Sequence, residues 1–221
     1  MSYRIRMMHK EDIDQVSEID REAFPTQLPP PNYQHELRNR LAHYIVAYGV
    51  DETEEVPQEP DPPRDDANGV GSLWQKVFGR NNAREKKKVI SEYGNHDIVG
   101  FVGFWVIADE AHIISIASRV PLRRNGIGEL LLIAAIDLAV ELKAQNITLE
   151  VRVSNTEAQR LYTKHGFAQA GVRHGYYVDN REDGLIMSTD SITSAAYKAQ
   201  FQRLKQLYYS KWGITPRKIT R

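Results

Sequence analysis

Arg123-Arg124-Asn125-Gly126-Ile127-Gly128 is the stretch that decides the fold of this 221-residue chain. An apolar strand pattern precedes it, and a strongly apolar helix pattern follows over residues 126–144. Glycines at 126 and 128 let a ligand approach the backbone closely, and the unpaired amides that begin a helix attract anions. Two arginines add positive charge nearby. The stretch therefore predicts a diphosphate site, although a glycine turn that merely starts a helix has the same pattern.

Strand and helix patterns alternate on both sides of this turn. Downstream, the sequence predicts a strand over Ile147–Val153, a helix over Ser154–His165, and strands near 168–178 and 184–189. Ser154 and Glu157 match a helix capping box. Upstream, it predicts strand Tyr3–Met7, a helix from Glu11, a helix over Tyr33–Leu41, a strand over 43–48, and strands Ile98–Ile107 and Ala111–Ser118. This mixture predicts an α+β fold with mixed αβα layers.

Residues 51–96 interrupt the regular pattern and predict a mobile insertion. Residues 51–66 carry eight acids, one base and four prolines, and cannot bury enough surface to offset the entropy of ordering. Residues 70–90 have the pattern of a short amphipathic helix with a basic end, which would rest on the parent domain or bind a partner or membrane surface. The predicted organisation is a domain over 1–190 and a C-terminal helical extension over 191–221.

The predicted extension has large apolar residues at helical spacing, namely Tyr197, Phe201, Leu204 and Tyr208. They predict a helix over 193–212 that packs on its own domain or on a second subunit, as in a homodimer. After Asp190 the chain carries seven basic residues and no acidic one, so RNA contact is the alternative.

Composition excludes several kinds of site and partner. Lys+Arg and Asp+Glu both total 29, so overall charge gives no reason to expect DNA binding. The absence of cysteine excludes disulfides, thiolate metal sites and a cysteine nucleophile. The seven histidines lack metal-ligand spacing and are interpreted as scattered surface residues, so no metal is expected. Without a signal segment or a long apolar run, we expect no membrane span and a cytoplasmic location.

Several motifs together resemble the GNAT superfamily of acetyltransferases. The turn has the form Arg/Gln-x-x-Gly-x-Gly/Ala, which in that family holds the diphosphate of acetyl-coenzyme A, and Ile114–Ser118 looks like the family's splayed strand. Further motifs narrow the resemblance to the ribosomal-protein-alanine N-acetyltransferase branch. They are Leu149–Asn155, Ala158–Phe167, Arg173-x-x-Tyr176-Tyr177 and Arg181–Met187.

This resemblance implies a central, mostly antiparallel, splayed mixed sheet with helices on both faces. It also implies transfer of the acetyl group of acetyl-coenzyme A to a protein N-terminal amine by direct attack in a ternary complex. Alanine is the expected first residue, and a ribosomal protein is a possible substrate. A small-molecule amine acetyltransferase and a non-catalytic coenzyme-A-binding module are the alternatives. The insertion, the extension and the position of Pro121 depart from the family pattern.

The expected cofactor site combines the turn with residues that the resemblance adds. Backbone amides at the end of the splayed strand would stabilise the negative charge that develops on the thioester oxygen. Asn155 contacts the cofactor in the family, although it also suits a helix cap. The expected cofactor-binding residues are Ala117, Ser118, Arg119, Arg123, Arg124, Asn125, Gly126, Ile127, Gly128, Asn155 and Tyr162.

Glu150 and Tyr162 are the expected catalytic residues. Transfer needs a neutral amine, so a base must remove a proton, and Glu150 alternates with Leu149 and Val151 and so points away from their face. The matching glutamate of the family has this role, and an ion pair with Arg152 is the alternative. Tyr162 matches the family tyrosine that gives a proton to the leaving thiolate, and would otherwise be a core residue.

The acceptor would bind between the loop after Phe24 and the hairpin at 173–183. Tyr176 and Tyr177 would wall a narrow peptide groove, while Glu182 and Asp183 would receive a cationic terminus. Tyrosine pairs and acidic turns also occur without function. The expected substrate-binding residues are Phe24, Glu150, Arg173, Tyr176, Tyr177, Glu182 and Asp183.

Overall fold

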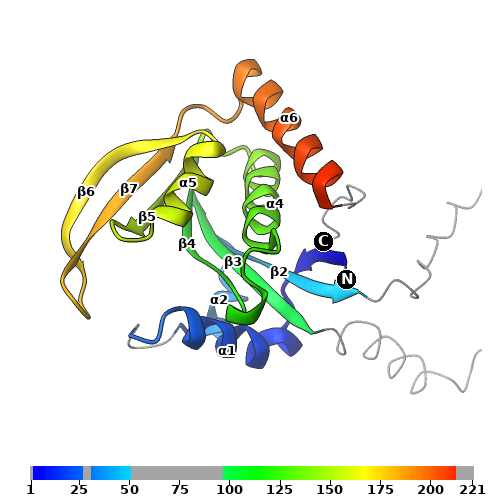
Figure 1. Ribbon diagram of the computed structural model, residues 1–221, viewed down its shortest axis with the longest axis vertical. Helices are drawn as coiled ribbons and strands as arrows, with labels where there is room; N and C mark the ends of the chain where they lie inside the picture. Colours follow the sequence, from blue (N-terminus) through cyan, green and yellow to red (C-terminus); the bar gives the residue numbers. More distant parts are fainter. Residues whose placement is uncertain (1, 27–30, 51–96, 213–221) are drawn as a thin grey trace, which may run out of the picture.

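The computed structural model describes residues 2–26, 31–50 and 97–212 (Figure 1). The predicted insertion at 51–96, with its amphipathic helix, lies outside the described residues, as do residues 213–221 of the predicted extension. The elements are, in chain order, β1 (Ser2–Met7), η1 (Lys10–Asp12), α1 (Ile13–Ala23), α2 (Tyr33–Glu36), β2 (Ala42–Val50), β3 (Ile98–Ile107), β4 (Glu110–Ser118), η3 (Val120–Leu122), α4 (Ile127–Glu141), β5 (Asn146–Arg152), α5 (Thr156–Lys164), β6 (Phe167–Tyr177), β7 (Glu182–Thr189) and α6 (Ala195–Trp212).

The strands form one mixed sheet of seven strands in the order β1-β2-β3-β4-β5-β7-β6. β4 and β5 run parallel, and the other neighbouring pairs are antiparallel. Figure 1 shows α4, α5 and α6 on one face of the sheet and α1 and α2 on the other. The predicted α+β fold, a mostly antiparallel mixed sheet with helices on both faces, is confirmed.

α4 is the centre of the larger core because its sequence is apolar on every side. Leu131, Leu132, Ile133 and Ile136 are almost fully buried among the strands and the C-terminal helix. A helix that is hydrophobic all round must be covered all round. Burying one such side chain contributes about 1.5–3 kcal/mol, so α4 and the turn at its start are held firmly against the sheet.

α1 packs on the opposite face through a single apolar stripe. Val16 and Ile19 are fully buried and contact a second core that includes Phe101 of β3. Their three-residue spacing places both on one side of the helix, as predicted. The opposite side of α1 carries charged residues that face solvent.

Two helix boundaries differ from the prediction. The first helix begins as a 3₁₀ turn, where the Asp12 carboxylate accepts a hydrogen bond of 2.6 Å from Arg6 and so stabilises the tighter turn. The helix predicted over Tyr33–Leu41 is only four residues long. The Asn39 side chain accepts a hydrogen bond from the Leu41 amide, so the chain turns into β2 and does not continue as helix.

The sheet opens between β4 and β5. β4 pairs with β5 over Glu110–Ile113 and Asn146–Leu149, but not beyond. On its other side, the pairing of β4 with β3 shifts by one residue, which leaves Ile114 as an extra residue in β4. A bulge of this kind bends a strand, so the end of β4 diverges from β5. The predicted splayed strand over Ile114–Ser118 is confirmed.

α6 packs along α4 on the same face of the sheet (Figure 1). Phe201 and Tyr208 are buried in the larger core, and Lys205 Nζ lies 2.6 Å from the Asp137 carboxylate of α4. The predicted packing of this helix on its own domain is confirmed, whereas the predicted homodimer stays a prediction. Within the part of the chain that the structure describes, no helix is both long and apolar enough to cross a membrane.

Candidate active site

The turn between β4 and α4 has the geometry of an anion site. η3 leads into it, and Gly126 caps α4 in a left-handed conformation with φ +81°. Arg123 and Arg124 are exposed, but Arg124 forms an ion pair with Glu157 of α5. Ile127 is buried in the core and so anchors the start of α4, where the helix-terminal amides lack partners within the helix. The turn therefore presents helix-terminal amides and positive charge on one surface.

The end of β4 differs in one detail from the prediction. The Arg119 amide donates to the Val99 carbonyl at 2.9 Å, and its guanidinium contacts Glu18. The expectation that Arg119 supplies an amide to the thioester oxygen is therefore wrong. Because the amides of a strand alternate between its two edges, those of Ile116 and Ser118 point towards the opening beside β5.

α5 holds Tyr162 in the interior beside the opening. Asn155 caps this helix by accepting a hydrogen bond from the Ala158 amide at 3.2 Å. The capping box predicted at Ser154 is wrong by one residue, because the Ser154 amide donates to Glu182 at 2.6 Å. Tyr162 is buried, and burial, together with the nearby Tyr177, raises the pKa of its hydroxyl far above the ordinary value. The hydroxyl therefore keeps its proton at neutral and moderately alkaline pH.

Glu150 is a buried carboxylate on the face of the sheet that carries α1 and α2. Its neighbours Leu149 and Val151 point into the larger core, which confirms the predicted alternation. One Glu150 carboxylate oxygen lies 3.0 Å from His112 Nε2 and the other lies 3.0 Å from the Arg173 guanidinium. The side chain is 7% exposed. The alternative ion pair of Glu150 with Arg152 is absent from the salt bridges of the described residues.

His112 is a site residue that sequence analysis missed. It lies on β4 opposite Thr148 of β5, and its Nδ1 is 3.0 Å from the Thr148 hydroxyl. That hydroxyl donates to Glu110, so polar groups continue from Glu150 along both strands. The interpretation of His112 as a scattered surface histidine is wrong. Alternation with buried Ala111 predicts its face, but the register of two parallel strands cannot be deduced from local sequence.

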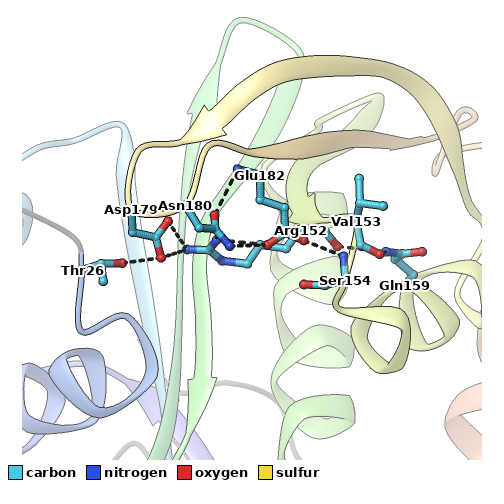
Figure 2. A network of polar contacts seen from close by, with 8 residues as sticks. All are labelled: Thr26, Arg152, Val153, Ser154, Gln159, Asp179, Asn180 and Glu182. Atoms are coloured by element: carbon cyan, nitrogen blue, oxygen red, sulfur yellow. Dashed lines mark hydrogen bonds and ion pairs between the residues drawn. The ribbon is translucent and has the colours of Figure 1, made fainter.

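Arg152 is the centre of a polar network that holds the β6–β7 hairpin (Figure 2). Its guanidinium lies 2.9 Å from Asp179 and 3.2 Å from Glu182, and it also covers the Tyr177 ring, whose centroid is 3.9 Å away. Asp179 accepts a further hydrogen bond of 3.1 Å from Thr26, which follows α1. The network therefore joins the hairpin both to the end of β5 and to the segment after α1.

Glu182 and Asp183 are both occupied by contacts with other residues of the protein. Hydrogen bonds from Ser154, with a smaller contribution from Arg152, lower the pKa of Glu182 to about 2. Asp183 accepts hydrogen bonds from the Gly175 amide at 2.8 Å and pairs with His174. Both carboxylates thus stabilise the hairpin, and their contacts do not support the predicted role as receivers of a cationic terminus.

The aromatic residues predicted to bind the acceptor lie on β6 and at the end of α1. Tyr176 and Tyr177 are in edge-to-face contact with ring centroids 5.1 Å apart, and the Arg173 guanidinium lies 5.4 Å from the Tyr176 ring. Phe24 ends α1 and packs partly on the smaller core. Their role in binding an acceptor stays a prediction.

Comparison with protein families decides the class of this chain. The model described as the acetyltransferase (GNAT) family matches residues 50–167, which is more than half of the sequence. The chain belongs to the GNAT acetyltransferase family. It is an N-acetyltransferase, and acetyl-coenzyme A is its cosubstrate.

Relatives of this N-acetyltransferase cover most of its length. A Bacillus subtilis (strain 168) protein with the provisional name ribosomal protein bS18-alanine N-acetyltransferase is 33% identical over 83% of this chain and 92% of its own. An N-alpha-acetyltransferase from Sulfurisphaera tokodaii is 30% identical over 84% of this chain and 92% of its own. The crystal structure of the Escherichia coli ribosomal-protein-S18-alanine N-acetyltransferase has the same fold, with a TM-score of 0.57 and 20% identity over 88% of this chain and 97% of its own.

The turn of this N-acetyltransferase has room for the diphosphate of acetyl-coenzyme A at Gly128. A Cβ at Gly128 would meet, among the described residues, only Leu161 Cδ2 at 4.0 Å. A Cβ at Gly126 would instead lie 2.6 Å from Trp212. Gly126 is thus required by packing inside the protein, whereas Gly128 leaves the first turn of α4 open to a ligand. The amides there fit an anion.

Proposed function

We propose that this chain acetylates the α-amine at the N-terminus of a protein, with alanine as the preferred first residue. The observation that carries the proposal is Glu150, a buried carboxylate beside the opening between β4 and β5. It faces the side of the sheet where the hairpin and the segment after α1 meet, while the anion turn lies at the start of α4 on the other side. Two relatives that act on protein N-termini by name, at 33% and 30% identity, support this acceptor class.

Glu150 removes the proton that blocks attack. An N-terminal amine has an ordinary pKa near 8, so it is largely an ammonium at neutral pH and has no lone pair. Glu150 lies within contact distance of His112, and the two groups form a pair over which a proton taken from the amine is shared. Arg173 pairs with the other carboxylate oxygen and so fixes the orientation of the Glu150 side chain.

Backbone amides of β4 and the hydroxyl of Tyr162 stabilise the negative charges that arise on the thioester oxygen and on the leaving thiolate. When bound, acetyl-coenzyme A supplies an activated thioester. The Ile116 and Ser118 amides point into the opening, where they stabilise negative charge on a carbonyl oxygen. Tyr162 keeps its hydroxyl proton because burial raises its pKa, and it donates that proton to the thiolate that leaves. The proton that the attacking nitrogen loses as the amide forms restores the tyrosine hydroxyl. The chain has no cysteine to carry the acetyl group as a thioester, and in this proposal attack by the amine is direct, in a ternary complex.

Acceptor selection depends on the groove between Phe24 and the β6–β7 hairpin. Tyr176 and Tyr177 would form one wall of this proposed groove, and the Thr26–Asp179 hydrogen bond, which joins the segment after α1 to the hairpin, would limit it at one end. A limited groove favours a thin, extended chain end with a small first side chain. A ribosomal protein is the candidate partner, since the Bacillus subtilis relative acts on one by name.

The deciding experiment is a mass-spectrometric acetylation assay with the full chain, acetyl-coenzyme A and peptides that differ only in their first residue. Alanine, serine and methionine peptides are compared with a pre-acetylated peptide that keeps an internal lysine, and with free polyamines. We expect acetylation at the free α-amine, fastest for alanine. A higher kcat/KM for a free amine than for every peptide would favour small-molecule acetylation. Tight binding of acetyl-coenzyme A with no transfer to any of these acceptors would indicate a binding module.

A further inference from the structure

The last turn of α6 contacts the turn that begins α4. The Tyr208 hydroxyl donates to the Gly126 carbonyl at 3.2 Å. The Trp212 ring fills the space that a Cβ on Gly126 would need, with ring atoms 2.6–2.9 Å from that position. Both contacts are made at the glycine that caps the helix, so α6 touches the anion turn directly.

Planarity of the peptide bond gives the Tyr208 contact a consequence on the ligand side. The Gly126 carbonyl and the Ile127 amide belong to one planar trans peptide unit, so they point in opposite directions. The carbonyl accepts from Tyr208 and also from the Leu130 amide at 2.9 Å. Holding the carbonyl inside therefore fixes the first peptide unit of α4, and with it the position of the first helical turn, which is open at Gly128.

The hydroxyl of Tyr208 is well suited to this task. Tyr208 is 2% exposed, and burial, followed by the charge of nearby Glu129, raises its pKa far above the ordinary value. The group therefore remains a proton donor at the pH at which the enzyme works. Since a buried hydroxyl without a partner is costly, the bond to Gly126 persists.

α6 is held in place at several points besides this turn. The Tyr197 hydroxyl donates to the His165 carbonyl at the end of α5 at 3.0 Å, and Lys205 pairs with Asp137 of α4. Phe201 is buried between these two anchors. The helix therefore spans from the end of α5 to the beginning of α4 as a fixed element (Figure 1).

We propose that Tyr208 and Trp212 are positioning residues for the diphosphate of acetyl-coenzyme A, and that α6 completes the cosubstrate site from behind. The inference rests on the proposed role of the Gly126–Gly128 turn as the diphosphate site. Neither residue touches the reacting atoms. Their effect is on the affinity for a donor that carries a diphosphate, and not on the chemical step.

The test compares Tyr208→Phe with Tyr197→Phe in the full chain. Each change removes one hydroxyl-to-carbonyl hydrogen bond of α6, but Tyr197 contacts α5 and not the turn. By calorimetry, Tyr208→Phe should raise the Kd and KM for acetyl-coenzyme A about three- to tenfold with kcat at saturation unchanged. The two variants should lower the melting temperature by similar amounts, because each loses one hydrogen bond of α6. Only Tyr208→Phe should change the Kd for acetyl-coenzyme A.

A truncated donor provides the second arm. Acetyl-pantetheine has the same thioester but no diphosphate, so its kcat/KM should be equal in the wild type and in Tyr208→Phe. Trp212→Phe should likewise weaken binding of acetyl-coenzyme A and spare acetyl-pantetheine. An unchanged Kd in Tyr208→Phe, an equal rise in Tyr197→Phe, or an equal loss with both donors would overturn the inference. A wild-type chain that did not bind acetyl-coenzyme A would instead overturn the proposed function.

Discussion

Glu150 on β5 and His112 on β4 face each other across the parallel strand pair, with a carboxylate oxygen 3.0 Å from the imidazole Nε2. His112 Nδ1 is 3.0 Å from the Thr148 hydroxyl, which itself donates to Glu110. Because Thr148 gives its proton to Glu110, its oxygen accepts from His112, and Nε2 is left to exchange a proton with Glu150. The pair thus provides both a base and a place to which the proton can move.

Glu150→Gln should lower kcat/KM for an alanine peptide by roughly 10²–10⁴-fold at pH 7, the usual contribution of a general base. At pH 9 the amine is already neutral for most molecules, since its ordinary pKa is near 8. The deficit should therefore shrink as pH rises, which a rate series from pH 6 to 9 measures. A deficit that stays constant across the series would remove Glu150 from the role of base.

His112→Gln should keep a polar side chain beside the Glu150 carboxylate but cannot take up a proton. We expect kcat to fall about tenfold, equivalent to about 1.4 kcal/mol, with KM for the peptide nearly unchanged. His112→Phe also removes the polar group and should be slower still. If the two variants had wild-type kcat, the pair would have no part in proton transfer.

Tyr162→Phe should reduce kcat by about 10²-fold or more, because the leaving thiolate loses its proton donor. The ring stays in its contact with Phe167, whose centroid is 5.7 Å away, so thermal stability should change little. Tyr209→Phe is the matched control, since burial also raises the pKa of its hydroxyl but it lies on α6, away from the proposed catalytic residues. A large loss of stability without loss of kcat in Tyr162→Phe would assign it to the core alone.

Glu182 gives the hairpin a pH dependence. Its folded pKa is lowered from the ordinary 4.5 to about 2 by hydrogen bonds from Ser154, so its stabilisation is fully present above pH 4.5. It should be lost as pH falls towards 2. A carbon-detected NMR titration of the Glu182 carboxyl should give a midpoint near 2, and Glu182→Gln should abolish the dependence. A midpoint near 4.5 would mean that the bond to Ser154 is not formed in solution.

Gly126→Ala and Gly128→Ala should separate packing from ligand binding. At Gly126 an added methyl meets Trp212 and a left-handed backbone, so we expect a loss of stability of about 1–3 kcal/mol. At Gly128 the methyl is in open space, so the melting temperature should hold while the Kd for acetyl-coenzyme A rises. Equal melting temperatures for the two variants would contradict this distinction.

The sequence predicted the strands and most of the helices because their cores are strongly periodic. It placed Glu150 on the correct face and the anion turn at the start of α4, since both depend on local alternation or on glycine. The family resemblance supplied Tyr162. Each of these features depends on a few neighbouring residues, so the local pattern of apolar residues and glycines is enough to predict it.

The errors at the candidate site involve contacts between distant segments. The start of α5 moved by one residue because Glu182, from β7, takes the Ser154 amide. His112 was missed because it meets Thr148 through the register of two parallel strands, and no short-range pattern specifies that register. The contact of Trp212 with Gly126 joins positions from different ends of the domain. Non-local pairing of this kind becomes visible only in three dimensions.

The additional residue in β4 has a consequence for how such an enzyme can change. Ala111 and Ile113 face the larger core before Ile114, whereas Ile116 does so after it, so the inward positions switch parity at that point. The divergence of β4 from β5 consequently depends on the number of residues in β4 and not on the identity of the side chain at the bulge. We expect substitutions at Ile114, which is 39% exposed, to leave the bulge intact, and deletion of one residue there to shift the register of the end of β4 by one position. Libraries restricted to point substitutions would not sample that change of register.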